Sequence, residues 1–201
     1  MANIGLRTFL YAPLGDDEKY TEEPDRLAGA ISYDENIETN EAELYYDDEL
    51  GEYDYSFVRG TLTLGIDNDD EVIFAPLLGN KVEEVTFDEA ELKVVQDVAS
   101  DQPVPVGFGF IERKRVGGAD KFRVKFYKKV TFRPIKNSGQ TKGRNMEFST
   151  PTVEGVIQTL SDGSWRTRAT LDDLETAVAF LESLFVQSVP EEGGGQEGGQ
   201  T

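Results

Sequence analysis

Carboxylates are the only abundant side chains in this sequence that could support acid–base or metal chemistry. The 201 residues include 39 Asp and Glu but no His and no Cys. Ser-His-Asp and Cys-His nucleophiles, thiolate or imidazole zinc ligands and disulfides are therefore excluded. A carboxylate pair could still hydrolyse a glycosidic bond, but with so many acidic residues no spacing singles out one pair. The composition favours a non-enzymatic protein, with an acidic carbohydrate-binding or glycosidase domain as an alternative.

Three short segments approach known ligand-binding motifs, and each lacks a required feature. Gly107-Phe108-Gly109 lacks the third glycine of a dinucleotide site, and 138–144 lacks the spacing of a phosphate loop. Asp67–Glu71 resembles the start of a calcium loop, but Val72 occupies the sixth position, where that loop needs glycine. No cofactor or metal is therefore predicted, and the acids before Val72 favour the start of a helix.

Charge is segregated along the chain. Residues 1–102 contain 27 acidic and 6 basic side chains, 103–146 contain 2 and 12, and 147–201 contain 10 and 2. Like charges gathered in this way repel one another unless surfaces of opposite sign meet. The basic strands could pair with acidic ones inside one monomer, or basic and acidic surfaces could meet between copies. Both arrangements remain open, and they are compatible.

The basic segment has the clearest strand pattern. After Gly117-Gly118, Phe122, Val124 and Phe126 alternate with basic residues, which predicts a hairpin of about 104–129. Interleaved aromatic and basic side chains also occur in proteins that bind single-stranded nucleic acid. That interpretation is less favoured, because the aromatic residues suit a core face and the net charge of -19 repels phosphate.

The remaining patterns predict a mainly β protein, an antiparallel β-sandwich or open barrel with one C-terminal α-helix packed on it. Residues 1–26 are expected to form an extended N-terminal arm rather than a core strand, 27–187 the β domain, and 188–201 a disordered Gly/Glu-rich tail. The apolar stripe of 171–185 predicts the helix, and Thr170 with Asp173 resembles a capping box.

Turn residues divide the β domain. The sequence predicts a hairpin with a long acidic tip spanning about 45–55, and a second hairpin joining 152–160 to 164–170 across Asp162-Gly163. A short helix is expected after Asp70, with Pro76 limiting its length. Residues 80–102 are expected to be irregular, with one strand near 82–87.

No stretch approaches the roughly 18 apolar residues that a membrane-spanning helix needs. The first residues contain no apolar run that ends at a small-residue cleavage site. We therefore expect this chain to be synthesised in the cytoplasm and not to insert into a membrane.

Six segments follow one another in a characteristic order along the sequence, and they are Gly5–Pro13, Arg26–Ile31, Ala42–Asp48, Gly60–Leu64, Phe148–Gly155 and Trp165-Arg166. Together these segments resemble the major tail proteins of siphophages and related prophages, over about residues 3–186. The resemblance lies in the order and spacing of the segments rather than in a single motif.

The resemblance implies a β-sandwich subunit with a flanking helix and no catalytic residue. Six copies would form a ring, and stacked rings would form a tail tube in the virion that conducts DNA through an acidic lumen. The implied partners are other copies of the chain, a tape-measure protein, and tail terminator or tip proteins. The inner-tube protein of a contractile or secretion-type injection system is the alternative with the same architecture.

Combining the family picture with the residue patterns predicts the surfaces involved. The strand 37–44, polar on both faces, is expected to line the lumen through Glu38, Glu41 or Glu43. The aromatic and acidic hairpin tip, the N-terminal arm and the basic hairpin are expected to touch neighbouring subunits. The expected contact residues are Tyr45, Tyr46, Asp47, Asp48, Glu49, Tyr53, Tyr55, Arg113, Lys114, Arg115, Lys125 and Lys129.

Overall fold

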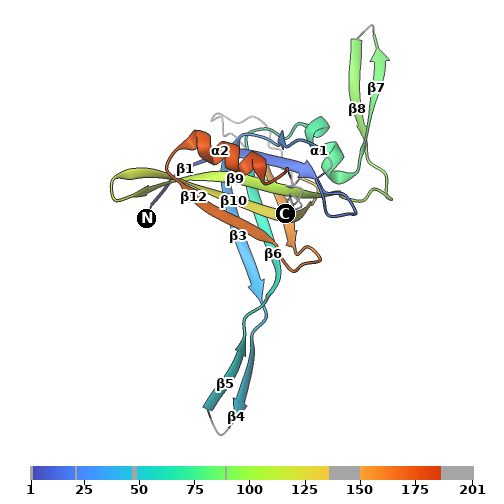
Figure 1. The fold of residues 1–201 in the computed structure, drawn as a ribbon. Coiled ribbons are helices and arrows are strands. Elements are labelled where there is room, and N and C mark those ends of the chain that lie inside the picture. Colours follow the sequence, from blue (N-terminus) through green and yellow to red (C-terminus); the bar gives the residue numbers. More distant parts are fainter. Residues whose placement is uncertain (1, 21, 47–48, 89, 136–149, 187–201) are drawn as a thin grey trace, which may run out of the picture.

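Twelve strands and two helices make up the described part of the chain, which comprises residues 2–20, 22–46, 49–88, 90–135 and 150–186 of a computed structural model (Figure 1). The strands are β1 (Ala2–Pro13), β2 (Asp25–Arg26), β3 (Ala30–Thr39), β4 (Ala42–Tyr46), β5 (Glu49–Asp54), β6 (Phe57–Ile66), β7 (Lys81–Phe87), β8 (Ala90–Gln96), β9 (Pro105–Val116), β10 (Ala119–Phe132), β11 (Thr152–Gln158) and β12 (Arg166–Leu171). The helices are α1 (Glu71–Leu78) and α2 (Leu174–Ser183).

One antiparallel sheet of eight strands forms the body, in the order β2-β1-β9-β10-β11-β6-β3 with β12 as a further partner of β10. The sheet branches at β10. Along one edge β10 pairs with β9, and along the other Phe122–Tyr127 pair with β12 while Lys129–Phe132 pair with β11. The branched sheet curls, so that side chains of β3 reach β9, β10 and β12 across its interior. The predicted fold class, mainly antiparallel β with a C-terminal helix, is confirmed.

The main core lies inside the curled sheet. Phe9 of β1 packs against Phe108 and Phe110 of β9, with ring centroids 5.4 and 5.8 Å apart. Helix α1 adds the buried side chains of Phe74 and Leu77 to the same cluster. Alternate residues of the strands therefore point into one apolar interior, as a period of two requires.

A second apolar cluster lies on the outer face of the sheet, under α2. Ala177, Leu181 and Phe185 pack on residues of β1, β9 and β10, including Val124 and Phe126. The apolar stripe predicted within 171–185 therefore packs on the sheet, as expected. The helix begins later than expected, because β12 continues to Leu171 and the side chain of Asp173 caps the helix by accepting a hydrogen bond from the Thr176 amide. The predicted capping box that starts at Thr170 is therefore wrong.

Helix α1 begins where the acidic residues predicted it. The side chain of Asp70 accepts a hydrogen bond from the Val72 amide, and Gly79 ends the helix in the left-handed conformation. Pro76 does not stop the helix, which continues to Leu78. Burial of Leu77 against the core holds the last turn in place despite the hydrogen bond that proline cannot donate.

Two long hairpins project from the body, and we call them the β4–β5 ribbon and the β7–β8 ribbon. Figure 1 shows that they extend in opposite directions, with the β7–β8 ribbon on the side of the body where α2 lies. The β4–β5 ribbon continues the β3–β6 pair, and the predicted hairpin around 45–55 is therefore confirmed. Residues 90–96, expected to be irregular, form β8, which pairs with β7 along its whole length.

The N-terminal strand departs from its prediction. Residues 2–13 form a core strand and not an extended arm, since β1 pairs with β9 and buries Phe9 and Ala12 completely. Residues 14–26 return across the edge of the sheet, where β2 pairs with Leu10 and Tyr11 of β1. The predicted disordered tail, 188–201, lies outside the described residues.

The predicted hairpin of 152–170 is wrong, although its turn exists. The Leu160 amide donates to the Ser164 carbonyl at 2.9 Å, and Gly163 adopts φ of 78°. The strands on either side diverge from this turn, because each pairs with a different part of β10. The sequence therefore predicted the position of the turn correctly, but the pairing of β11 with β12 was wrong.

Candidate interaction surfaces and the buried ion-pair network

Four of the predicted contact residues lie on the strands of the β4–β5 ribbon. Tyr45 and Tyr46 lie on β4, and Glu49 and Tyr53 lie on β5. Asp47 and Asp48, predicted at the turn between them, lie outside the described residues. The side chains of 42–54 also lie outside them, so the contacts expected of the tip stay predictions.

The root of this ribbon is held firmly to the body. The Asn40 amide donates to the Ser56 carbonyl at 2.7 Å, and the Phe57 ring stacks on Trp165 with centroids 4.3 Å apart. The Arg166 guanidinium lies 4.2 Å from the centroid of the Trp165 ring. Tyr55, a predicted contact residue, is 62% exposed beside this root. The base of the ribbon is therefore fixed in direction while its strands extend away from the core.

The three predicted lumen residues lie near the same root, where the long polar strand divides into β3 and β4. Glu38 pairs with Arg59 across the β3–β6 ladder, with its Oε2 2.6 Å from Arg59 Nε, and Glu41 is exposed. Glu43 lies on β4, and its side chain is not among those described. Ile37 packs against the main core, so the strand is not polar on both faces as predicted.

The β7–β8 ribbon is an amphipathic element of which the sequence predicted only the first strand, near 82–87. Opposite residues of an antiparallel pair share a face, and the register places Val85 opposite Leu92, Phe87 opposite Ala90, and Glu83 opposite Val94. This face, the apolar face of the ribbon, leaves Phe87 70% and Leu92 45% exposed. The alternation of Val85 with Phe87 and of Leu92 with Val94 on either side of an acidic turn was the available signal.

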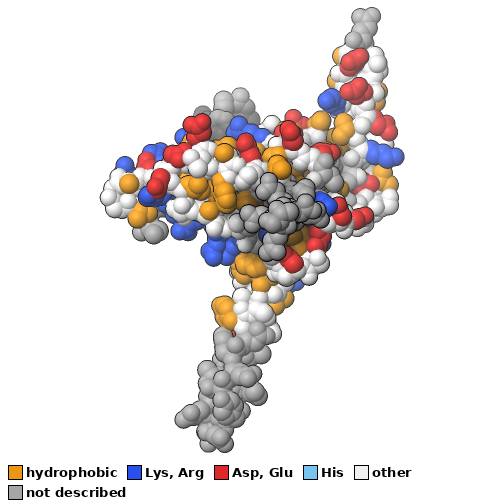
Figure 2. All heavy atoms as spheres, in the orientation of Figure 1, with side chains coloured by type: hydrophobic (Ala, Val, Ile, Leu, Met, Phe, Trp, Pro, Cys, Tyr) orange, Lys and Arg blue, Asp and Glu red, His pale blue; other side chains and the backbone are white. Residues whose placement is uncertain are grey.

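The other face of the β7–β8 ribbon is more polar toward its tip. Glu84 lies opposite Lys93, and Thr86 lies opposite Glu91. In Figure 2, acidic atoms follow this ribbon, while Lys and Arg atoms gather toward the lower edge of the body. Acidic side chains therefore predominate along this ribbon, whereas on the body several basic side chains lie beside acidic ones.

Most of the predicted basic contact residues pair with acids of the same monomer. Arg113 and Arg115 both contact Asp120 beside the Gly117-Gly118 turn, the latter with 3.5 Å between Nε and Oδ1. The hydrogen bond from Arg113 lowers the pKa of the Asp120 carboxyl. Lys114 pairs with buried Glu112 at 3.1 Å, and Lys129 is half-buried.

Lys125 is not the surface contact that the alternating pattern predicted. Its side chain is about one-tenth exposed, and its Nζ lies 3.1 Å from Glu35 Oε2 and 3.3 Å from Glu112 Oε1. The reason is the curl of the sheet, which lays β3 over this face of β10. The arrangement in which basic strands pair with acidic ones inside the monomer is confirmed here.

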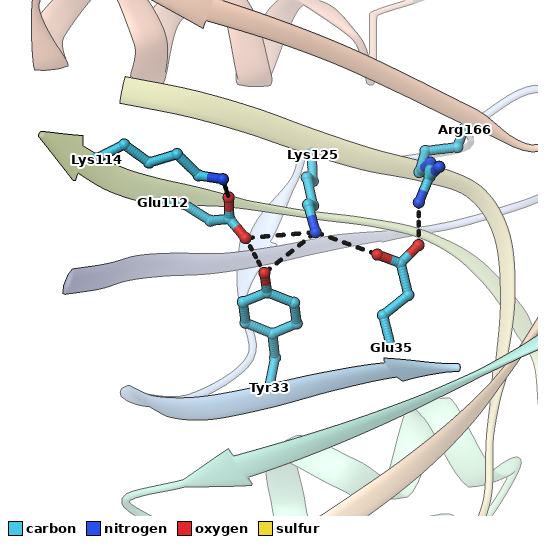
Figure 3. A network of polar contacts seen from close by, with 6 residues as sticks. All are labelled: Tyr33, Glu35, Glu112, Lys114, Lys125 and Arg166. Atoms are coloured by element: carbon cyan, nitrogen blue, oxygen red, sulfur yellow. Dashed lines mark hydrogen bonds and ion pairs between the residues drawn. The ribbon is translucent and has the colours of Figure 1, made fainter. Parts of the chain in front are cut away.

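Around Lys125, six residues from four strands form an ion-pair network (Figure 3). The members are Tyr33 and Glu35 of β3, Glu112 and Lys114 of β9, Lys125 of β10 and Arg166 of β12. The Tyr33 hydroxyl donates to Glu112 and accepts from Lys125 at 3.1 Å. Arg166 binds the second oxygen of Glu35.

The network joins β3 to the opposite side of the body. Among the described strands, β3 pairs through its backbone with β6 alone, so these side chains connect it to β9, β10 and β12. Each carboxylate lies within ion-pair distance of two cations, and Lys125 Nζ lies close to oxygen atoms of Tyr33, Glu35 and Glu112. Tyr127 lies beside the network, and burial raises its pKa well above the usual range. Side chains paired with one another in this way position strands rather than offer a base or nucleophile.

Within the described ranges, no three or more His, Cys, Asp or Glu side chains are grouped so that they could hold a metal ion. Neither described helix combines the length and apolar character needed to cross a membrane. No protein-family model matches the chain, and a search of curated proteins gives no match. The features that remain to suggest a role are the two ribbons, the charged faces and the overall fold.

Proposed function

We propose that this chain is the structural subunit of a bacteriophage tail tube, in which hexameric rings stack around an acidic lumen that conducts DNA. The observation that carries the proposal is the pair of ribbons that leave one compact body in opposite directions (Figure 1). A subunit of a stack needs contacts on both of its axial sides, and the ribbons offer one on each. The family resemblance of the sequence supplies the ring and the tube.

The ribbons support self-assembly on physical grounds. A lone two-stranded hairpin is at best marginally stable in water. In the part of the chain that the structure describes, the β4–β5 and β7–β8 ribbons are each a separate two-stranded sheet. Packing against a neighbouring subunit would cover their free edges and stabilise them. In the proposed assembly each ribbon therefore gains its partner from another copy.

Charge supports the proposed passage of DNA. The net charge of -19 makes strong binding of a polyanion to this surface unfavourable. A lumen lined by Glu38, Glu41 or Glu43 would repel the phosphates, which lets DNA slide without adhering. The tape-measure protein and the terminator or tip proteins would be its other partners in the virion. No catalytic step is proposed.

Electron microscopy of the purified protein tests this function. Rings or tubes are expected as concentration rises, and monomers that persist at high concentration would refute the proposal. Alanine at Asp47, Asp48 and Glu49 together is expected to impair stacking of the rings.

A sharper variant removes the β4–β5 ribbon at its root. Residues 41–55 are replaced by Asn-Gly, because the Asn40–Ser56 hydrogen bond already brings the two ends together. The variant should remain folded and lose stacking. Emission from Trp165, the only tryptophan, reports on folding of the root, since it stacks on Phe57 there. A folded variant that still forms tubes would contradict a role of this ribbon in stacking.

A further inference from the structure

We propose that the apolar face of the β7–β8 ribbon docks on a second copy of this chain, at the basic surface on the side of β10 and β12 that faces away from α2. This inference rests on the proposed function to the extent that it requires the chain to self-associate. It adds a specific contact to it. The contact joins Val85, Phe87, Leu92 and Glu83 of one copy to the region of Arg123 and Arg168 on the next.

Exposure is the first reason. Four large apolar side chains of this face are exposed by 37–70%, and they are Val85, Phe87, Leu92 and Val94. They sit on an element that the body does not cover. Contiguous exposed apolar groups with charged neighbours are typical of interaction sites. The face carries two charges, Glu83 opposite Val94 and, at the root of the ribbon, Lys81 opposite Gln96.

The second reason is a basic surface on the same chain that lacks internal partners. The register places Arg168 opposite Lys125 and Thr170 opposite Arg123, so both arginines lie on the face of β10 and β12 that Lys125 shares. Arg168 is exposed and Arg123 is half-buried. Among the described residues, neither arginine has a carboxylate within salt-bridge distance, whereas Lys114, Lys125 and Arg166 all do.

The third reason is direction. Val124 and Phe126 face α2, so Arg123, one residue away along the strand, faces the opposite side of the sheet. The β7–β8 ribbon extends on the α2 side (Figure 1). A ribbon therefore cannot reach the arginines of its own chain, but it can reach those of a copy placed beyond it. Such a contact is head-to-tail and propagates along a stack.

Charge reversal tests the pairing. Glu83→Lys and Arg168→Glu are each expected to weaken self-association about tenfold or more, and the two changes together in one chain should restore most of it. Glu91→Lys makes the same change on the other face of the ribbon, and it should leave association unchanged. No recovery in the double variant would overturn the pairing of Glu83 with Arg168.

The apolar contact is tested in the same assay. Phe87→Ser should reduce association by a similar factor, since exposed aromatic side chains often dominate interfaces. Val82→Ser is the matched control, because Val82 lies on the opposite face. Unfolding midpoints of these variants should equal that of the wild type, as the ribbon lies outside both cores. Equal association of Phe87→Ser and wild type would overturn the proposal.

Cross-linking identifies the occupant. The chain has no cysteine, so Ala90→Cys chains and differently tagged Thr170→Cys chains can be mixed and treated with a short bis-maleimide. Ala90 lies opposite Phe87 and Thr170 lies opposite Arg123, so both cysteines flank the contact and leave its residues in place. The mixed product is expected. A product joining two Ala90→Cys chains would instead show that ribbons pair with ribbons, and no product in assembled particles would show that another partner covers this face. Both results overturn the proposal.

The proposed function and the proposed contact can be refuted independently. If the wild type forms no rings or tubes, the function itself is refuted. If the wild type assembles and the ribbon variants assemble equally well, only this contact is refuted.

Discussion

Replacing Glu112 by Gln should destabilise the protein more than any other single neutralisation in the ion-pair network. The substitution conserves size and removes one negative charge. Glu112 is 1% exposed, and it is bound by Lys114, Lys125 and the Tyr33 hydroxyl. In the wild type three cations share two carboxylates, and in the variant three cations would share Glu35 alone.

The magnitude follows from the cost of an unpaired buried charge, which is about 3–5 kcal/mol when one partner of a buried pair is removed. Lys125→Met should cost less, about 1–2 kcal/mol. It leaves two cations with two carboxylates, and Met keeps the apolar stem in place. The expected order contradicts the simple idea that the residue with the most partners matters most, since Lys125 contacts three groups and its removal balances the charge.

Urea denaturation of monomeric protein measures this order. With a slope of about 3 kcal/mol per molar urea, Glu112→Gln should lower the midpoint by on the order of 1 M. Glu38→Gln is the matched control, because its carboxylate is 44% exposed and pairs with Arg59 at the surface; its midpoint should barely move. A midpoint for Glu112→Gln no lower than that for Lys125→Met would refute the charge-balance reasoning.

Three further outcomes are expected. Gly109→Ala should destabilise the fold by about 1–3 kcal/mol in thermal unfolding, since the added methyl group would lie 2.4 Å from Leu181 of α2. Gly5→Ala is the control and should be neutral, because a methyl group there would lie 3.7 Å from its nearest neighbour. Asp173→Ala should lower the unfolding temperature at pH 7. The hydrogen bond from Thr176 lowers the pKa of Asp173 in the folded protein. The stabilisation by the Asp173 carboxylate is therefore complete above the ordinary Asp pKa, and it is lost as pH falls through the lowered pKa of the folded state. An equal decrease in unfolding temperature at pH 7 and at pH 2 would contradict this reasoning. Leu181→Ala should cost about 2–5 kcal/mol in urea, because the side chain is fully buried.

Local patterns in the sequence predicted elements well where neighbours along the chain decide them. The basic hairpin, the long projecting hairpin and the apolar stripe of α2 all depend on turn residues and periodicity within one segment. The Asp162-Gly163 turn was also correct. Its flanking strands were not, because pairing with β10 competes with hairpin pairing, and only the whole sheet decides that competition.

The N-terminal strand shows the same limit. Pro13 and the acidic stretch after it suggested an arm, and Pro13 is in fact the last residue of β1. A proline is compatible with a strand end. What makes β1 a core strand is its long-range pairing with β9, about 100 residues away, which no local pattern reveals.

The basic residues show how curvature divides one strand face into two environments. Arg123 and Lys125 lie on the same side of β10, and alternation alone assigns them the same role. β3 crosses this face near Lys125 and brings Glu35 to it, so Lys125 is desolvated and must be paired within the chain. Glu35 pairs with Lys125 and Arg166 and not with Arg123 or Arg168, so these two arginines remain available to a partner outside the chain. The basic residues of the sequence therefore find acidic partners in two places. Some pair within the monomer, in the ion-pair network, and in our proposal others pair with the ribbon of the next copy.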